Sequence, residues 1–260
     1  MSDLLPLLVA LPLLAAVAPL FLARRSRRLA RAVTVAVLLA QVALVAAVAW
    51  LVVREGAVDY VVGAIPAAFG IGLLVDRLSI AFAALVATAG VAALLADPTP
   101  GERDGPFYSL WLLLVAGFTG VTVTGDVFNL YVFLEISGLA AYALVARAEG
   151  GPAALAALQY LLLGTVGATC YLLGVGYAYV ATGTLNMADM ATQLPHGSPL
   201  AVAAFAGVAV GLAVKMALYP LHVWQPDAYE HAPWAVSALL SALVSTVAGY
   251  ALLRLTYSVF

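Results

Sequence analysis

The sequence predicts an all-α membrane protein, a polytopic bundle of about eight transmembrane helices. Of its 260 residues, 65% are hydrophobic and only 9% are charged, and the mean hydropathy is +1.08. A soluble domain carries roughly 25% charged residues because its surface faces water. The apolar residues also gather in runs of about 20, the length of a helix that crosses a bilayer. This composition excludes a soluble enzyme and a disordered tail.

The ionisable residues and the single cysteine limit which partners and cofactors the chain can have. The formal net charge of −2 provides no basic surface for nucleic acid. Cys170 is the only cysteine, which excludes an internal disulfide and a cysteine metal cluster. The histidines and acidic residues show no metal-ligand spacing on a shared helix face. We therefore expect no nucleic-acid partner, no metal site and, because no nucleotide or flavin motif is present, no cofactor.

The first apolar run, residues 4–22, is expected to be a retained helix rather than a cleaved signal. A secretory signal carries its positive charge before its apolar run, whereas here the charge follows it. The positive-inside rule places such a cluster in the cytoplasm. Both termini are then expected outside, because an even number of spans returns the chain to its starting side. The cluster consists of Arg24, Arg25, Arg27, Arg28 and Arg31.

Seven further apolar runs are each long enough to cross the membrane as a helix. Glycine, proline and charged residues separate them, as is typical of turns. Before the third run of the chain, we expect Asp76 and Arg77 to lie at the outer membrane interface. After the first run, the predicted spans are residues 32–53, 78–96, 107–123, 127–146, 153–181, 200–221 and 234–253.

Glu135 lies near the middle of the predicted span 127–146. A charge at a helix centre costs about 2.5–3.5 kcal/mol, and ten Leu, Ile, Phe and Val residues return roughly 3–6 kcal/mol. The helix therefore tolerates Glu135 without needing it. One interpretation is a glutamate bonded to a neighbouring helix; a functional role is favoured, because intramembrane ionisable residues usually mark ion pathways. Tyr131, Gly138 and Tyr142 share its helix face.

Lys215 is the only lysine and lies inside the span 200–221. A lysine near a helix end can extend to the interface. Here Pro220 follows five residues later and should break the helix. Broken helices at membrane depth line cavities, so Lys215 is expected to face a hydrated interior. His222 lies beyond the break, where an interfacial loop position and a proton-relay role are equally compatible with the sequence.

Glu135 and Lys215 together have the properties of a proton-transfer pair. Burial favours the neutral form of each side chain, whereas the approach of the two favours the charged form of both. Small changes of surroundings can then move a proton. A sodium site is a poorer explanation, because it needs several oxygen ligands and the spans supply few charged ones.

Three segments resemble the antiporter-like subunits shared by complex I (NADH:quinone oxidoreductase), membrane-bound hydrogenases and the Mrp cation/proton antiporters. Residues 125–144, GDVFNLYVFLEISGLAAYAL, resemble the glutamate-bearing fifth helix of that family. Residues 182–189, TGTLNMAD, look like the loop after its sixth helix. Residues 215–233, KMALYPLHVWQPDAYEHAP, followed by VSALLS, are similar to its broken seventh helix and the start of its eighth. The Mrp D-type subunit is the member that the sequence resembles most.

The resemblance implies a proton-translocating subunit that contributes one half-channel to a larger complex in the cell membrane. It makes Glu135 and Lys215 the paired channel residues and His222 a further residue of the polar axis. It divides the chain into helices 1–3 (residues 1–106) and proton-channel helices 4–8 (residues 107–260), the first inverted repeat. The implied partners are other membrane subunits, lipid and protons, with Na⁺ exchange left open. The chain is not expected to be an enzyme alone.

Two departures from the family pattern shape these expectations. The eighth helix of the family usually carries a lysine where this sequence has Thr246. Family members usually have about fourteen helices in two inverted repeats, so we expect a separate polypeptide or a neighbouring antiporter-like subunit to supply the second. A stripe of small residues in the last span should allow another helix to approach closely. The stripe consists of Ser237, Ser241, Ser245 and Gly249.

Two alternatives to proton conduction remain at this stage. The chain could be a structural subunit that fills the membrane part of the complex and conducts nothing, which Thr246 favours and the retained Glu135 and Lys215 oppose. It could also be a quinone-binding module of a redox complex. Aromatic residues near the break allow this, but none marks a site for a quinone headgroup.

Overall fold

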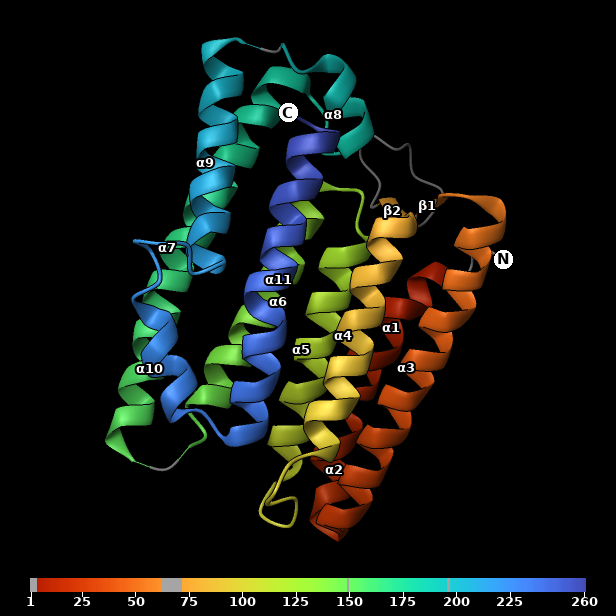
Figure 1. Ribbon diagram of the computed structural model, residues 1–260, viewed down its shortest axis with the longest axis vertical. Helices are drawn as coiled ribbons and strands as arrows, with labels where there is room; N and C mark the ends of the chain where they lie inside the picture. The colour runs from red at the N-terminus through yellow and green to blue at the C-terminus, as the bar shows by residue number, and fades with distance from the viewer. Residues whose placement is uncertain (1–3, 62–71, 149, 196) are drawn as a thin grey trace.

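The chain folds into a bundle of apolar helices, as the composition predicts (Figure 1). The computed structural model describes residues 4–61, 72–148, 150–195 and 197–260. Within these ranges, seven helical stretches are long and apolar enough to span a membrane. One further passage, the seventh in chain order, is interrupted, and its first helix, Pro199–Lys215, has only 17 residues. The helices are α1 (Leu5–Ala15), α2 (Ala18–Arg25), α3 (Arg27–Glu55), α4 (Arg77–Leu95), α5 (Gly105–Val123), α6 (Val127–Val145), α7 (Gly151–Thr182), α8 (Met187–Gln193), α9 (Pro199–Lys215), α10 (Trp224–His231) and α11 (Trp234–Ser258).

Aspartates fix where several of these helices begin. The carboxylate of Asp76 accepts a hydrogen bond from the Ser79 amide at 2.8 Å and caps α4. Asp104 caps α5, and Asp126 caps α6 in the same way. An N-cap oxygen satisfies an amide that the helix itself leaves without a partner. Asp76 and Arg77 stand at a helix end, because Arg77 is the first residue of α4; their position at the outer membrane interface stays a prediction.

The arginine-rich connection after the first passage is much shorter than the sequence suggested. Only Ser26 separates α2 from α3, and its hydroxyl accepts a hydrogen bond from the Leu29 amide. Arg24 and Arg25 therefore end α2, whereas the remaining arginines of the cluster lie in the first turns of α3. The reason is that arginine is a good helix former and its stem can extend along a helix toward water.

Two elements were not predicted. A short antiparallel pair of strands, β1 (Val58–Val61) and β2 (Gly72–Val75), follows α3, with Val58 opposite Val75. The short helix α8 lies in the segment after α7, and Asn186 caps it. Both lie at the end of the bundle where the C-terminus is found (Figure 1). They leave the all-α class of the membrane part unchanged.

Helix α5 occupies the centre of the bundle and is largely shielded from the surroundings (Figure 1). It packs against α1, α2, α4, α6 and α11. Gly120 allows the close approach of α6, because a Cβ at this position would lie 2.3 Å from the Phe133 ring. This packing sets the position of α6, the helix that carries Glu135.

Helices α7 and α9 pack with their backbones in contact over much of their length. A Cβ at Gly207 would lie 2.8 Å from the Cα of Gly174, and a Cβ at Gly174 would lie 2.5 Å from the Val208 amide nitrogen. Small residues permit such approach, which maximises van der Waals contact where no hydrophobic effect drives association. The contact fixes α9, at whose end Lys215 lies.

The small-residue stripe of α11 contacts α10 of the same chain. The Ser237 hydroxyl donates to the Tyr229 carbonyl at 2.7 Å, and the Ser245 hydroxyl accepts from the Gln225 amide. Ser241 is exposed and bonds within its own helix. At Ser237 and Ser245 the neighbouring helix is thus α10 of this chain; the approach of a helix from another subunit stays a prediction.

Candidate functional site

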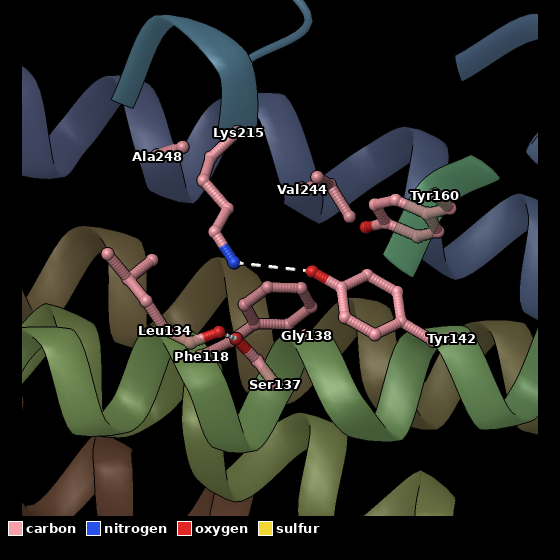
Figure 2. A pocket seen from close by; sticks show the side chains of 9 residues that line it. All are labelled: Phe118, Leu134, Ser137, Gly138, Tyr142, Tyr160, Lys215, Val244 and Ala248. Atoms are coloured by element: carbon pink, nitrogen blue, oxygen red, sulfur yellow. Dashed lines mark hydrogen bonds between the residues drawn. The ribbon is translucent and has the colours of Figure 1, made fainter. Parts of the chain in front are cut away.

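The structure brings together two of the three residues singled out in the sequence. Lys215 is the last residue of α9, and its ammonium donates to the Glu135 carboxylate of α6 at 3.0 Å. It also donates to the Tyr142 hydroxyl at 3.3 Å (Figure 2). Glu135 and Tyr142 are seven residues apart, so two turns of α6 place them on one face. The predicted shared face is thus observed, and Tyr142 joins the pair.

The two charges are buried to different degrees. The Lys215 side chain is 9% exposed, whereas the Glu135 side chain is 24% exposed. In a low-dielectric interior a charge is stable only when it is paired and hydrogen-bonded. Lys215 therefore depends on its two partners, whereas Glu135 can still be reached from the surface of the bundle.

A small cavity adjoins the Lys215 ammonium. Its volume is about 20 Å³, which is enough for one water molecule. Polar groups from three helices open into it beside apolar side chains (Figure 2). The lining residues are Phe118, Leu134, Ser137, Gly138, Tyr142, Tyr160, Lys215, Val244 and Ala248.

The interruption of the seventh passage begins earlier than predicted. Helix α9 ends at Lys215, five residues before Pro220, and α10 begins only at Trp224. The physical reason is that a proline ring clashes with the carbonyl four positions earlier, here that of Met216. The chain leaves the helix at this point, with Ala217 in the left-handed region at φ 55°. Lys215 is thus at the break itself rather than one turn before it.

The freed carbonyls of α9 find new partners inside the bundle. The Leu218 amide donates to the Ala213 carbonyl at 2.9 Å, and the Trp224 indole donates to the Val214 carbonyl at 3.0 Å. Helix ends buried without such bonds would be costly. The break is therefore a satisfied structure rather than a local unfolding.

Aromatic side chains connect the break back to Tyr142. Tyr160 of α7 stacks on Trp224 with ring centroids 4.0 Å apart and planes 2° apart. It also meets Tyr142 edge-on at 4.5 Å. Trp224 in turn bonds the carbonyl next to Lys215 in the chain. Tyr160 and Trp224 could not be singled out from the sequence, because spacing along one helix carries no information about rings on three different helices.

His222 is not joined to this cluster by a hydrogen bond. It lies between α9 and α10, and its ring is 5.5 Å from that of Tyr219. Its Nδ1 atom is buried without a hydrogen-bond partner in the described part of the chain. Because the chain is not helical between Lys215 and Trp224, His222 does not continue the helix face on which Lys215 lies.

A second buried ion pair was missed. Arg254 of α11 is only 7% exposed and pairs with Asp76. Ser79 contacts both Arg254 and the Tyr250 hydroxyl. Burial alone would raise the pKa of Asp76, but the hydrogen bond and charge of Arg254 lower it below the usual value. The pair ties α11 to the start of α4.

No cluster in the described ranges suggests a metal site: none brings three or more His, Cys, Asp or Glu side chains together. Around Lys215, an ammonium, a carboxylate and a phenol lie within hydrogen-bonding distance, and groups of these types can exchange protons.

Comparison with known proteins agrees with the resemblance. Residues 124–260, more than half of the chain, match the model of the NADH:quinone oxidoreductase/Mrp antiporter transmembrane family. The chain is 47% identical over 262 residues to NADH-quinone oxidoreductase subunit N of Desulforudis audaxviator, covering 97% of this chain and 52% of that protein. It is 37% identical over 206 residues to the D-type subunit of a probable K⁺/H⁺ antiporter of Rhizobium meliloti, covering 77% and 38%.

The comparison of the fold with solved structures agrees with the sequence comparison. A chain in the structure of the Mrp complex from a Dietzia species superposes with a TM-score of 0.90 at 30% identity, over all of this chain and 49% of the other. The chain thus spans about half the length of these proteins, or less. It belongs to the NADH:quinone oxidoreductase/Mrp antiporter family of membrane subunits.

Proposed function

We propose that this chain is a proton-translocating subunit and that Glu135, Tyr142 and Lys215 form its proton-transfer unit. The observation that carries the proposal is the position of the Lys215 ammonium. It lies at the break of a membrane helix, is almost fully enclosed, and bonds both a carboxylate and a phenol. Buried ionisable groups inside a membrane bundle usually mark ion pathways.

The geometry supports a simple transfer step. With Glu135 ionised, the ion pair holds Lys215 charged. A proton that reaches the partly exposed Glu135 removes this counter-charge and leaves an ammonium with little solvent around it. Such a charge is costly in a low-dielectric interior, so Lys215 releases its proton. The proton passes to water in the adjoining cavity, either directly or through Tyr142, whose oxygen accepts it while its own hydroxyl proton moves on to that water.

His222 extends the unit on the far side of the break. Its buried Nδ1 atom is available to accept or donate a proton, since it has no hydrogen-bond partner among the described residues. Histidine changes protonation near neutral pH more readily than any other side chain. We assign it the next position on the polar axis, reached through water rather than by direct contact.

The chain works as one subunit of a larger assembly in the cell membrane. Its relatives are by name subunits of NADH-quinone oxidoreductase and of cation/proton antiporters. The helices that match the remaining half of those proteins, on this polypeptide or on another, would complete the proton path. An ionisable residue from them would take the role that Thr246 cannot fill.

A second candidate is a structural subunit that conducts nothing. Thr246, where the resemblance leads one to expect a lysine, favours it, because a hydroxyl cannot hold a proton as a charge. The two candidates differ in what substitutions at Glu135 and Lys215 do to transport.

The test is ion-coupled proton movement by the assembled complex in proteoliposomes. Glu135→Gln and Lys215→Ala should abolish it, and Lys215→Arg should be inactive because a guanidinium does not release its proton. Glu135→Asp should retain part of the activity, and His222→Gln should lower it. Arg77→Gln, which removes an exposed charge at the start of α4, is the matched control and should keep the wild-type rate. Wild-type transport in both Glu135→Gln and Lys215→Ala, with the complex intact, would instead support the structural role.

A further inference from the structure

Two adjoining cavities share Arg28 and Arg31 at the end of the bundle that carries the arginine cluster. The first has a volume of about 700 Å³ and is lined by Ser26, Arg27, Pro100 and Gly101 in addition to the two shared arginines. The second, of about 580 Å³, continues from the same arginines along α3 to the end of α4. Because they share Arg28 and Arg31, the two cavities form a single groove, whose first half is lined mainly by polar residues and whose second half is lined mainly by apolar ones.

The apolar half follows one face of α3. Ala32, Val35, Ala36 and Leu39 line it at helical spacing, and Leu95, the last residue of α4, closes it. The two alanines provide a low floor between α3 and α4, which run side by side (Figure 1). Leu39 and Leu95 are both about half exposed, at 53% and 52%. The groove therefore opens toward the hydrocarbon side of the bundle.

The polar half carries positive charge that no ion pair among the described residues neutralises, although Asp97 acts on Arg31 through its longer-range charge. Within the described residues, neither Arg28 nor Arg31 has a carboxylate within 4 Å or a side-chain hydrogen bond. The aspartates of the nearby loop, Asp97 and Asp104, pair with other arginines, and Glu102 is exposed. Arg27 is engaged by the Gly101 carbonyl at 3.3 Å.

We propose that this groove binds an anionic diacyl phospholipid, with its phosphate between Arg28 and Arg31 and an acyl chain along Ala32, Ala36 and Leu39. Charge complementarity selects the headgroup, because guanidinium groups bind phosphate with paired donors. Basic pockets between transmembrane helices on the cytoplasmic side are suited to such headgroups. The proposal is independent of proton transfer, since the groove lies on α3 and α4 and the Lys215 cluster on α6 and α9.

The proposal can be tested on the purified complex in neutral detergent by native mass spectrometry. Three probes are added: dioleoylphosphatidylglycerol, dioleoylphosphatidylcholine with the same chains, and glycerol 3-phosphate with the headgroup chemistry alone. We expect only the phosphatidylglycerol to be retained. Arg28→Gln with Arg31→Gln should weaken its binding about 30-fold, from the contribution of two basic residues near a membrane surface.

Two further variants separate the halves of the site. Arg24→Gln with Arg25→Gln removes the same charge from α2, outside the groove, and should leave binding unchanged. Ala36→Phe fills the floor, keeps every arginine and should also weaken binding, which tests the apolar half if the arginine variant does not assemble. Equal retention of phosphatidylcholine, retention of glycerol 3-phosphate alone, or equal loss in the Arg24/Arg25 variant would overturn the proposal. So would a disulfide or bifunctional cross-link from Leu39→Cys to a helix of another subunit, because the groove would then hold protein.

Discussion

Gly164 of α7 lies directly against the hydroxyl of Tyr142, the phenol that bonds Lys215: a Cβ at this position would be 2.0 Å from the oxygen. Gly164→Ala should therefore displace the Tyr142 hydroxyl and lengthen its bond to Lys215. Overpacking of this kind costs about 1–3 kcal/mol. We expect a lower thermal unfolding midpoint together with slower proton transport.

Gly176 provides the matched control on the same helix, because a Cβ there meets nothing within 4 Å. Gly176→Ala should raise the stability by up to about 1 kcal/mol through helix propensity and leave transport unchanged. Equal transport rates in the Gly164 and Gly176 variants would show that the Tyr142 position does not matter.

The ion pair between Glu135 and Lys215 predicts a strongly non-additive double-mutant cycle. Glu135→Gln leaves the enclosed Lys215 charge without its carboxylate and should destabilise the protein by roughly 3 kcal/mol. Lys215→Met should cost less, because Glu135 keeps about a quarter of its side chain exposed, at 24%, and can be solvated. The double variant should be more stable than Glu135→Gln alone. Thermal unfolding in detergent measures all four proteins, and additive losses would mean that the two charges do not interact.

The loop between α4 and α5 predicts one component of acid sensitivity. Burial alone would raise the pKa of Asp97, but the hydrogen bond and charge of Arg103 outweigh burial and lower it below 3.8. A carboxyl with a lowered pKa stabilises the fold at pH values above its unfolded value, and this contribution is lost as the pH falls through the folded pKa. Asp97→Asn should therefore reduce the unfolding midpoint near pH 6 and flatten its decrease below about pH 4. Asp59→Asn, with an exposed side chain, should leave the pH profile unchanged.

The topology prediction concerns the two ends of the bundle. The arginine cluster, Arg24, Arg25, Arg27, Arg28 and Arg31, should lie in the cytoplasm. In a Cys170→Ser background, Ser26→Cys should be protected from an impermeant thiol reagent added to intact cells. Tyr257→Cys, at an 82% exposed position near the other end, should react readily. The reverse pattern would invert the assignment.

The sequence was sufficient for the number of passages and for their type. Hydropathy locates a span because every lipid-exposed helix must satisfy its own backbone bonds inside an apolar run. Helical periodicity, which is a local property of the sequence, also placed Glu135 and Tyr142 on one helix face. Hydropathy was less accurate at helix ends: α3 begins five residues before the predicted residue 32, at Arg27.

The features that could not be predicted depend on contacts between helices that are distant in the sequence. Hydropathy cannot show that α5 is central, because a shielded helix and a lipid-facing helix are both apolar. It cannot pair Arg254 with Asp76, which are 178 positions apart. The β1–β2 strands were missed because a strand of four residues leaves little periodicity to detect.

The contacts around the break after α9 determine which parts can move during transport. Five residues around the break form a closed loop of contacts. The loop runs from Val214 through Trp224, Tyr160 and Tyr142 to Lys215, which follows Val214 in the chain. A hinge motion of α10 relative to α9 would have to break the indole bond and separate two stacked rings at once. The junction therefore behaves as a rigid joint. In the proposed mechanism, proton passage would then depend on rotations of the Lys215 and Tyr142 side chains and on water, while the backbone stays in place.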